Sequence, residues 1–287
     1  MAAGSTPTVL VTGASRGIGK ATAVAFADAG FDVAITARTR RAGESRDDSD
    51  AGGGRPLPGS LEETAAEVER RGRRCLVLVA DLHDAASLRD AAAQLLERWG
   101  APDVLVNNAV DTAAGSMVPF LELTVEQLER KLRANVVAQM VLLEALLPPM
   151  LERGGATVVN VTSHVATGDP PAPVGQGGWG LAYAASKAAF HRFAPILAVE
   201  LGRRGLRCFN LDPGYVETER QLRNAAALGL EGRYPGAPPS VPASVIVWLA
   251  TRPEAAELNG QTVLAQRFAR QHGTHPDWRR PPRPSPA

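Results

Sequence analysis

The chain has 287 residues, 45% of them hydrophobic, which is enough to bury the core of one large α/β domain. Its 31 basic and 30 acidic residues leave a formal net charge of +1, so no strong electrostatic field attracts nucleic acid or an anionic membrane. The two cysteines, Cys75 and Cys208, lie in apolar strand-like segments, which argues against a disulfide framework or a metal site and suits a reducing cytoplasm.

The first elements of the chain predict a phosphate-binding turn. Residues 8–12 form an apolar run typical of a buried strand, and apolar side chains recur at helical spacing after Lys20. A glycine-rich turn joins the two, and backbone N–H groups at the helix start can bind an anion. Ala21 follows Gly19-Lys20 where a mononucleotide P-loop requires Ser or Thr, which excludes a kinase or an ATPase. The turn residues expected to contact a dinucleotide are Gly13, Ser15, Arg16, Gly17, Ile18 and Gly19.

Strands and helices alternate along most of the remaining chain. This alternation predicts a doubly wound parallel sheet, the Rossmann fold, with helices on both faces, because right-handed crossovers place each helix against the sheet. Ligands bind beyond the carboxyl ends of the strands in such sheets, and these positions are polar or glycine-rich here. The expected later strands are 32–37, 76–80, 104–106, 156–161, 206–211 and 262–265, and the expected later helices are 61–71, 124–151 and 182–203.

Four segments are predicted to be irregular. Residues 40–60 have the composition of a mobile loop, and this insertion is either disordered or folded over the adenosine end of a dinucleotide. The others are a Pro- and Gly-rich loop at 168–180, a substrate loop at 214–242 and a Pro-rich tail at 279–287. One domain is expected over residues 1–287, with its core at about 8–265. The first residues do not resemble a signal peptide, and no uncharged apolar run approaches about 18 residues, so we expect a soluble cytoplasmic protein.

The residue after the second strand usually determines whether such a protein prefers NAD or NADP. An acid at this position bonds the ribose 2′-hydroxyl of NAD, whereas a cation pairs with the 2′-phosphate of NADP. Ala37 and Arg38 stand at this point, and Arg16 faces the same pocket from the glycine turn. Alone, each arginine could also be a solvated loop residue. Together they favour NADP(H) over NAD(H), because a guanidinium forms charge-assisted hydrogen bonds with phosphate. Asp81 and Leu82, after the third strand, are expected beside the adenine.

A tyrosine and a lysine carry the predicted chemistry. Tyr183 and Lys187 are four residues apart and therefore share one face of a helix. A tyrosine with a pKa near ~10 exchanges protons poorly at neutral pH, and a nearby cation that stabilises the phenolate makes it useful. His164 beside Ser163 suggests a hydrolase pair, but adjacent strand residues point to opposite faces and the chain has no Gly-x-Ser-x-Gly motif.

Several separate motifs follow one another at predicted strand ends or in predicted helices. They are Thr12-Gly13-Ala14-Ser15-Arg16-Gly17-Ile18-Gly19, Asn107-Asn108-Ala109, Asn135, Ser163, Tyr183 with Lys187, and Pro213-Gly214 with Thr218. Each alone is explained by ordinary turn or surface chemistry. In this order they make the chain resemble the short-chain dehydrogenase/reductase (SDR) family over residues of about 8–265.

The resemblance implies a role for each catalytic candidate. Tyr183 would exchange the proton on the substrate oxygen, while Ser163 would orient and polarise that oxygen. Lys187 would lower the pKa of Tyr183 and hold the nicotinamide ribose, and Asn135 would keep a water in a proton relay to Lys187. Two long helices, here the predicted helices 124–151 and 182–203, commonly form the interface between subunits in this family, so the resemblance implies a homodimer or homotetramer. The remaining cofactor contacts would be Asn108, Ala109, Pro213, Gly214, Val216 and Thr218.

The chain departs from the family pattern at a few positions. Val110 stands where the family commonly has Gly, and its branched side chain would narrow the pocket near the nicotinamide. Asp212 replaces a residue that is usually uncharged, and Pro195 is expected to kink the Tyr183 helix. Neither of these two is expected to touch the catalytic set directly.

The segment between Ser163 and Tyr183 is longer than most relatives need. It carries Trp179 one helical turn before Tyr183, and with Tyr215 and Tyr234 this side chain would form an aromatic wall for the substrate. The alternative is that Trp179 only packs the loop.

The leading hypothesis is an NADP(H)-dependent oxidoreductase that interconverts a small-molecule carbonyl and a secondary alcohol, with no metal. One rival is a non-catalytic NADP(H)-binding regulator, which would not need Ser163, Tyr183 and Lys187 together. Another is an enoyl reductase or epimerase on the same scaffold, although Ser163 favours carbonyl chemistry. Steroid, sugar, acyl-thioester and small ketone substrates remain open, because loops form the pocket walls.

Overall fold

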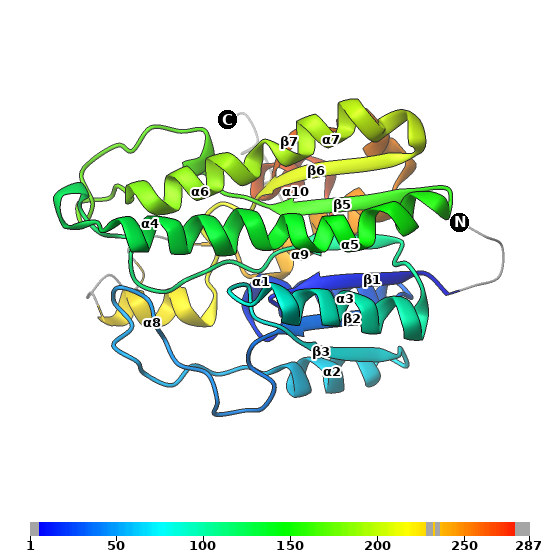
Figure 1. Cartoon of the computed structure of the whole chain (residues 1–287), viewed down its shortest axis with the longest axis horizontal. Helices are drawn as coiled ribbons and strands as arrows, with labels where there is room; N and C mark the ends of the chain where they lie inside the picture. The colour runs from blue at the N-terminus through cyan, green and yellow to red at the C-terminus, as the bar shows by residue number, and fades with distance from the viewer. Residues whose placement is uncertain (1–5, 228–231, 233–235, 279–287) are drawn as a thin grey trace, which may run out of the picture.

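A seven-stranded sheet forms the centre of the computed structural model, which describes residues 6–227, 232 and 236–278 (Figure 1). The strand order is β3-β2-β1-β4-β5-β6-β7, and every neighbouring pair is parallel. The predicted doubly wound sheet is therefore confirmed. The strands are β1 (Thr8–Thr12), β2 (Asp32–Ala37), β3 (Cys75–Val79), β4 (Val104–Asn107), β5 (Ala156–Val161), β6 (Leu206–Asp212) and β7 (Thr262–Leu264).

Helices cover both faces of this sheet. Buried side chains of α1, α2, α9 and α10 pack on one face, and those of α3, α5 and α7 pack on the other. The α-helices are α1 (Gly17–Asp28), α2 (Leu61–Glu69), α3 (Ala85–Trp99), α4 (Val125–Leu132), α5 (Ala138–Glu152), α6 (Leu181–His191), α7 (Phe193–Leu201), α8 (Glu219–Ala227), α9 (Ser240–Thr251) and α10 (Ala265–His272). Short 3₁₀ turns occupy Phe120–Glu122, His164–Ala166, Gly202–Arg204 and Pro253–Leu258.

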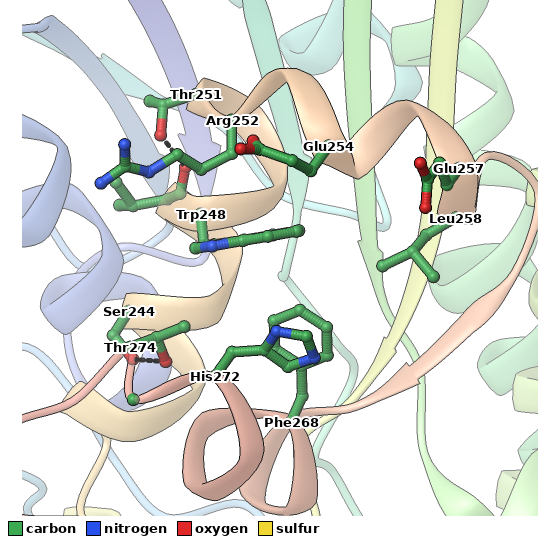
Figure 2. A pocket seen from close by; sticks show the side chains of 12 residues that line it. Ser244, Trp248, Thr251, Arg252, Glu254, Glu257, Leu258, Phe268, His272 and Thr274 are labelled. Carbon is green, nitrogen blue, oxygen red and sulfur yellow. Dashed lines mark hydrogen bonds between the residues drawn. The ribbon is translucent and has the colours of Figure 1, made fainter.

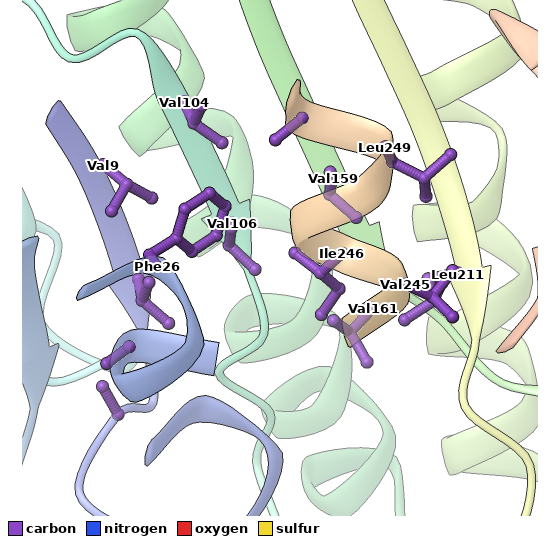
Figure 3. Close-up of a cluster of buried hydrophobic side chains, with 14 of the residues drawn as sticks. Val9, Phe26, Val104, Val106, Val159, Val161, Leu211, Val245, Ile246 and Leu249 are labelled. Atoms are coloured by element: carbon purple, nitrogen blue, oxygen red, sulfur yellow. The ribbon is translucent and has the colours of Figure 1, made fainter. Parts of the chain in front are cut away.

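Alternating side chains along β1 divide the core in two. Val9 and Val11 point to the face that α1 and α9 cover, whereas Leu10 points to the face of α3 and α5. All residues of β1 are buried, as expected for a strand covered on both sides. Figure 3 shows Phe26 of α1 against the side chains of Val9 and Val106, with none of its surface exposed. This packing fixes the sheet whose carboxyl edge carries the polar motifs.

The predicted helix at 124–151 is interrupted in the structure. After α4, residues Arg133–Val137 form a π-helical turn, and α5 then continues to Glu152. The whole stretch Val125–Glu152 is long and apolar enough to cross a membrane by length and composition, but 61% of its most apolar window is buried inside the fold, as in the core helix of a soluble protein. A π turn of this kind is often found at a functional position of a helix.

The second predicted long helix, 182–203, divides into α6 and α7 at Arg192. Pro195 follows three residues later, so the predicted kink lies where proline weakens the helix. A proline cannot donate to the carbonyl four residues before it, here that of His191. This carbonyl instead accepts a hydrogen bond of 2.7 Å from Nδ2 of Asn210 in β6.

The prediction of an irregular segment at 214–242 is wrong for two stretches. Helix α8 lies inside it, and α9 begins at Ser240. Helix α8 is mostly polar, and its short apolar stripe of Leu222, Ala225 and Ala226 lies in a segment whose Gly and Pro content favoured a loop. Helices α3 and α10 were also not among the expected elements.

The insertion at 40–60 folds over the sheet edge rather than remaining disordered. It contains no α-helix or strand, apart from an isolated bridge between Arg46 and Pro56. Ser45, Asp47 and Leu57 are nevertheless buried, at 5%, 2% and 2% exposure. The segment is therefore packed against the fold, and its position over the adenosine end of a dinucleotide stays a prediction.

Both cysteines lie in the sheet as free thiols, as expected. Cys208 in β6 is fully buried and Cys75 in β3 is half-buried. Burial raises the pKa of each thiol to about 12, so both are un-ionised at neutral pH.

Candidate active site

The glycine turn after β1 depends on residues without side chains. Gly13 has a φ of +68°, and a Cβ there would lie 2.8 Å from the Cα of Ala109. A Cβ on Gly19 would lie 2.3 Å from the carbonyl oxygen of Gly13. Only glycine allows this close packing. The turn thereby directs the start of α1, from Gly17 onward, toward the carboxyl edge of the sheet.

Thr12 joins the ends of β1 and β4, the two strands at which the chain switches direction across the sheet. Its Oγ1 accepts hydrogen bonds of 2.9 Å from the backbone N–H groups of Asn108 and Ala109. Nδ2 of Asn108 donates in return to the carbonyl of Thr12, also at 2.9 Å. Nδ2 of Asn107 donates to Oδ1 of Asn160 at 3.0 Å, so these asparagines cross-link the sheet as expected. A crevice at such a switch point is where dinucleotides bind in this architecture.

Three of the four catalytic candidates lie just after β5 or on α6. Ser163 follows the end of β5, and Tyr183 and Lys187 lie one turn apart on α6. Lys187 is 3% exposed, and its Nζ donates to the carbonyl of Val161 at 2.9 Å. Burial lowers the pKa of Lys187 to about 8, against the opposing effect of the Asp212 carboxylate. Burial raises the pKa of the Tyr183 phenol, and the nearby Ser163 hydroxyl opposes this shift only in part.

Asp212 acts on the catalytic candidates through its charge. Within the described part of the chain it makes no hydrogen bond or ion pair with the catalytic set, but it is 8% exposed and its negative charge raises the pKa of both Tyr183 and Lys187. Coulombic effects are strong here because the carboxylate is screened little by water. This charged residue therefore belongs to the electrostatic environment of the site.

Asn135 lies in the π turn between α4 and α5 and is 2% exposed. Its Oδ1 accepts a hydrogen bond of 2.8 Å from the N–H of Asp111, and its Nδ2 donates to Oγ of Ser186 at 3.0 Å. Ser186 in turn donates to the carbonyl of Tyr183. Asn135 thus connects the segment after β4 with the helix that carries Tyr183 and Lys187.

A buried ion pair next to Asn135 was not predicted. Nζ of Lys131, which is fully buried, lies 3.3 Å from Oδ2 of Asp111 and also donates to the carbonyls of Asp111 and Ala113. Burial alone would raise the pKa of Asp111, but Lys131 and Arg130 hold it below its usual value. One hint was that Lys131 is one of only three lysines in the chain.

The segment after β6 approaches the glycine turn. Gly214 has a φ of +67°, and its N–H donates to Oδ1 of Asp212 at 3.0 Å. The carbonyl of Pro213 accepts a hydrogen bond from Gln266. Val216 is 5% exposed, and Cγ2 of Thr218 would lie 3.1 Å from a Cβ on Gly17. The predicted cofactor residues after β1 and β6 therefore meet.

The structure describes two of the three aromatic side chains that were expected at the substrate pocket. Trp179 packs edge-to-face against His164, with ring centroids 6.1 Å apart. Tyr215 is 39% exposed and follows β6. Tyr234 lies outside the described residues. The aromatic wall therefore stays a prediction.

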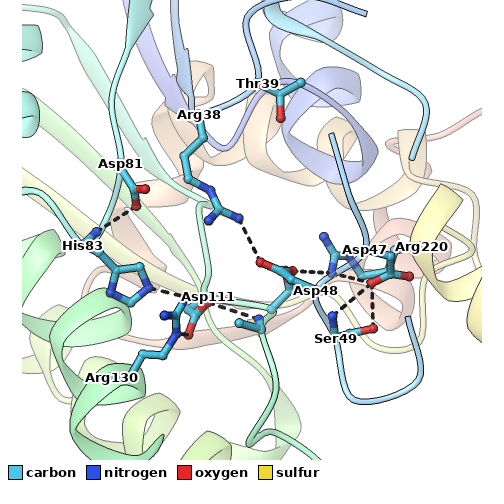
Figure 4. A network of polar contacts seen from close by, with 12 residues as sticks. Arg38, Thr39, Asp47, Asp48, Ser49, Asp81, His83, Asp111, Arg130 and Arg220 are labelled. Atoms are coloured by element: carbon cyan, nitrogen blue, oxygen red, sulfur yellow. Dashed lines mark hydrogen bonds and ion pairs between the residues drawn. The ribbon is translucent and has the colours of Figure 1, made fainter. Parts of the chain in front are cut away.

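Both predicted phosphate-binding arginines contact the insertion at 40–60. Arg16 donates to the carbonyls of Pro58 and Gly59, at 2.9 and 3.2 Å. Arg38 pairs with Asp48 at 3.3 Å (Figure 4). Neither guanidinium is only a solvated loop group.

The residues after β3 contact the segment after β4. Asp81 accepts a hydrogen bond of 2.9 Å from the N–H of His83, and Nε2 of His83 lies 3.7 Å from Asp111 (Figure 4). Leu82 packs partly against the core. These positions are at the expected edge of the sheet, on the side of β3.

A family model of short chain dehydrogenases matches residues 7–49 and 57–227. This chain is a short-chain dehydrogenase. The resemblance inferred from its motifs is thereby confirmed, and the unmatched residues 50–56 fall within the insertion. This short-chain dehydrogenase is accordingly an enzyme of the oxidoreductase class that acts on CH–OH groups with NAD(P).

Relatives of this short-chain dehydrogenase have several named activities. It is 35% identical to the oxidoreductase UcpA of Salmonella typhimurium over 211 residues, which cover 74% of the chain and 70% of the relative. It is 32% identical to the L-rhamnose 1-dehydrogenase (NAD(P)(+)) of a Sphingomonas strain over 266 residues, 90% of the chain and 93% of the relative.

Two solved structures extend the comparison. A short chain dehydrogenase from Mycobacterium paratuberculosis, solved with NAD, is 25% identical with a TM-score of 0.73, covering 91% of this chain and 96% of that one. A Beutenbergia cavernae protein described as an NAD(P) dependent gluconate 5-dehydrogenase, solved with NADP, is 29% identical with a TM-score of 0.72, covering 90% and 94%. A nicotinamide cofactor is therefore supported, with both NAD and NADP represented among neighbours.

A cavity of about 670 Å³ lies elsewhere on the short-chain dehydrogenase, between α9 and α10 (Figure 2). Trp248, Phe268 and His272 line it, and His272 stacks on Phe268 with ring centroids 4.0 Å apart. None of the candidate catalytic or cofactor residues lines this cavity. It is therefore separate from the site at the carboxyl edge.

Proposed function

We propose that this enzyme is an NADP(H)-dependent oxidoreductase that interconverts a carbonyl and a secondary alcohol. The observation that carries the proposal is the position of the buried Lys187, one turn after Tyr183 on α6, whose Nζ bonds the carbonyl of Val161 at the end of β5, two residues before Ser163. A phenol, a hydroxyl and an ammonium in this arrangement serve proton transfer to a substrate oxygen. A regulator that only binds a dinucleotide needs none of them.

Each catalytic candidate has a separate task in this proposal. Tyr183 donates a proton to the carbonyl oxygen during reduction and accepts it during oxidation, and Ser163 hydrogen-bonds the same oxygen. Lys187 stabilises the phenolate by its charge and hydrogen-bonds the nicotinamide ribose. Asn135, fixed by Asp111 and Ser186, positions a water that passes protons to Lys187. A bound nicotinamide supplies or accepts the hydride.

The chain's residues fit a dinucleotide. The cradle at the start of α1 contains Gly13 and Gly19, where added Cβ atoms would collide with backbone, and such a glycine turn accommodates a pyrophosphate. Arg16 and Arg38 adjoin it from the turn and the end of β2. The absence of an acid directly after β2 and these two guanidinium groups support NADP(H) as the preferred cofactor. Asp81 and Leu82 flank the adenine in this proposal.

Sugars and related polyols are the first substrates to test. The names of two relatives, an L-rhamnose 1-dehydrogenase and a gluconate 5-dehydrogenase, support this class. Trp179 and Tyr215 are the proposed wall of the pocket. A sugar ring packs its apolar face on an aromatic side chain while its hydroxyls bond polar groups.

A homo-oligomer is part of the proposal. Val137 and Met140 in the π turn and α5 are 50% and 54% exposed, and Ile196 and Val199 in α7 are 47% and 84% exposed. Apolar side chains exposed in groups mark protein interfaces. Light scattering coupled to size-exclusion chromatography should give a dimer or tetramer in a soluble preparation.

NADPH oxidation with a panel of sugars and ketones tests the function. Turnover with wild-type enzyme should disappear in Tyr183→Phe, because the substituted ring has no proton to transfer. Calorimetric titration of the same variant with NADP⁺ serves as control and should show binding. Unchanged turnover in Tyr183→Phe would refute the proposed role, and NADP⁺ binding without turnover of any panel member would favour the regulator.

A further inference from the structure

The insertion at 40–60 ties together loops that surround the candidate cofactor site. Asp50 accepts hydrogen bonds of 2.7 and 2.8 Å from the N–H groups of Gly115 and Met117, in the segment after β4. Arg220 of α8 donates to Asp47 at 2.9 Å. The insertion therefore forms a strap between the end of β2, the segment after β4 and helix α8.

Within this strap, the carboxylate of Asp48 is placed among guanidinium groups. Oδ2 of Asp48 lies 3.3 Å from Arg38, and Oδ1 lies 3.2 Å from Arg220 (Figure 4). Burial alone would raise the pKa of Asp48, but the hydrogen bonds and charges of Arg220 and Arg38 lower it, so the group is ionised at neutral pH. Arg16 contacts the same insertion further along, at the carbonyls of Pro58 and Gly59. Two guanidinium groups thus contact one carboxylate.

A second carboxylate lies at the start of α1. Oε2 of Glu219, the first residue of α8, accepts a hydrogen bond of 3.0 Å from the N–H of Gly17. Free N–H groups at a helix start bind anions, including the pyrophosphate of a dinucleotide. Glu219 therefore adjoins the position shared by NAD and NADP, whereas Asp48 contacts Arg38, which is proposed for the 2′-phosphate, together with Arg220 and the hydroxyl of Thr112.

We propose that Asp48 determines cofactor selectivity by occupying the 2′-phosphate position, so that NADP(H) must displace its carboxylate from Arg38 and Arg220, which then bind the phosphate. Glu219 is displaced by either dinucleotide. The inference rests on the proposed NADP(H) site and deepens it, because it adds Arg220 as a cation for the phosphate and names the group with which the phosphate competes.

The physical argument is a competition between two anions for the same donors. A guanidinium forms strong paired hydrogen bonds with either a carboxylate or a phosphate, but Arg38 cannot give the same N–H groups to both. Breaking the Asp48 contacts reduces the affinity for NADP(H) and not for NAD(H), which has no 2′-phosphate. Cofactor selectivity is the difference between the affinities for NADP(H) and NAD(H). A group that weakens the binding of NADP(H) only therefore changes this selectivity directly.

The test measures the Kd values of NADP⁺ and NAD⁺ by calorimetry for the full chain and three isosteric variants. Asp48→Asn removes the competing charge and should tighten NADP⁺ binding about fivefold or more while NAD⁺ binding changes less than about twofold. Glu219→Gln should tighten binding of both dinucleotides by the same factor. Asp50→Asn removes a charge from the same strap without a contact to Arg38 and should leave the ratio of the two Kd values unchanged.

A second pair of probes isolates the adenosine end. Adenosine 2′,5′-bisphosphate should follow NADP⁺ in tighter binding to Asp48→Asn, and 5′-AMP should follow NAD⁺. If Asp48→Asn fails to fold, as judged by circular dichroism, Asp48→Ser replaces it. Arg220→Gln should weaken NADP⁺ binding and leave NAD⁺ binding nearly unchanged.

Two results would overturn the inference. Weaker NAD⁺ binding with unchanged NADP⁺ binding in Asp48→Asn would mean that the carboxylate bonds the ribose 2′-hydroxyl. An equal shift of the ratio in Asp50→Asn would mean that the strap acts through its general charge. The proposed NADP preference is tested separately, by the ratio of the NADP⁺ and NAD⁺ Kd values in the wild-type enzyme. The inference is tested by the change of this ratio in Asp48→Asn.

Discussion

The charge of Asp212 should set the alkaline limit of activity through Lys187. Burial lowers the pKa of Lys187 from 10.5 to about 8, a cost to the charged form of about 3 kcal/mol at ~1.4 kcal/mol per pKa unit. With this pKa, about 90% of the enzyme carries the Lys187 ammonium at pH 7 and about 10% at pH 9. Because Asp212 raises the pKa of both Lys187 and Tyr183, Asp212→Asn should lower both.

The assay is the pH profile of kcat/KM for NADPH-dependent reduction, measured between pH 6 and 10 at constant ionic strength. Wild-type activity should fall as the pH rises through about 8, and the midpoint of Asp212→Asn should lie at lower pH. The asparagine keeps the acceptor for the Gly214 N–H, and Asp212→Glu, which keeps the charge, is the matched control. A midpoint that stays fixed or moves to higher pH in Asp212→Asn would refute the reasoning.

Three further predictions concern folding. Gly19→Ala should abolish dinucleotide binding and lower the Tm, because its Cβ would lie 2.3 Å from a backbone oxygen, and a normal Tm with normal binding would contradict this. Phe26→Ala should reduce the free energy of unfolding in urea by about 3–5 kcal/mol by leaving a cavity, and Phe26→Leu should cost less. Burial alone would raise the pKa of Asp32, but its contacts with Arg74 and Arg73 lower it. Asp32 therefore stabilises the fold at pH values above its unfolded pKa of 3.8. That contribution should be lost as pH falls through the lowered folded value, and Asp32→Asn should flatten the acid limb of the Tm profile.

The sequence could predict the site wherever short-range signals coincide with the topology. The glycine turn, Asn108, Ser163 and Pro213 all follow strands, and parallel strands end at one edge, so their approach could be expected before any coordinates. The pairing of Tyr183 with Lys187 depended only on helical spacing. These residues lie where they were expected, although their roles stay proposals.

Other features depend on contacts between distant residues and leave no local pattern. The π turn at Asn135 is supported by hydrogen bonds with Asp111 and Ser186, which lie 24 and 51 residues away. The contact of Asp48 with Arg220 spans 172 residues. Helix α8 was interpreted as part of a loop because its apolar stripe is short, and its polar side chain Arg220 contacts the distant insertion.

The two native thiols make this enzyme convenient for labelling. At a pKa of about 12, roughly 1 thiol in 100,000 is ionised at pH 7, and the thiolate is the form that alkylating dyes attack. A cysteine introduced by Ala42→Cys on the exposed part of the insertion would therefore take up a maleimide dye selectively, without removal of Cys75 or Cys208. Fluorescence of such a dye would report movement of the strap as each dinucleotide is added.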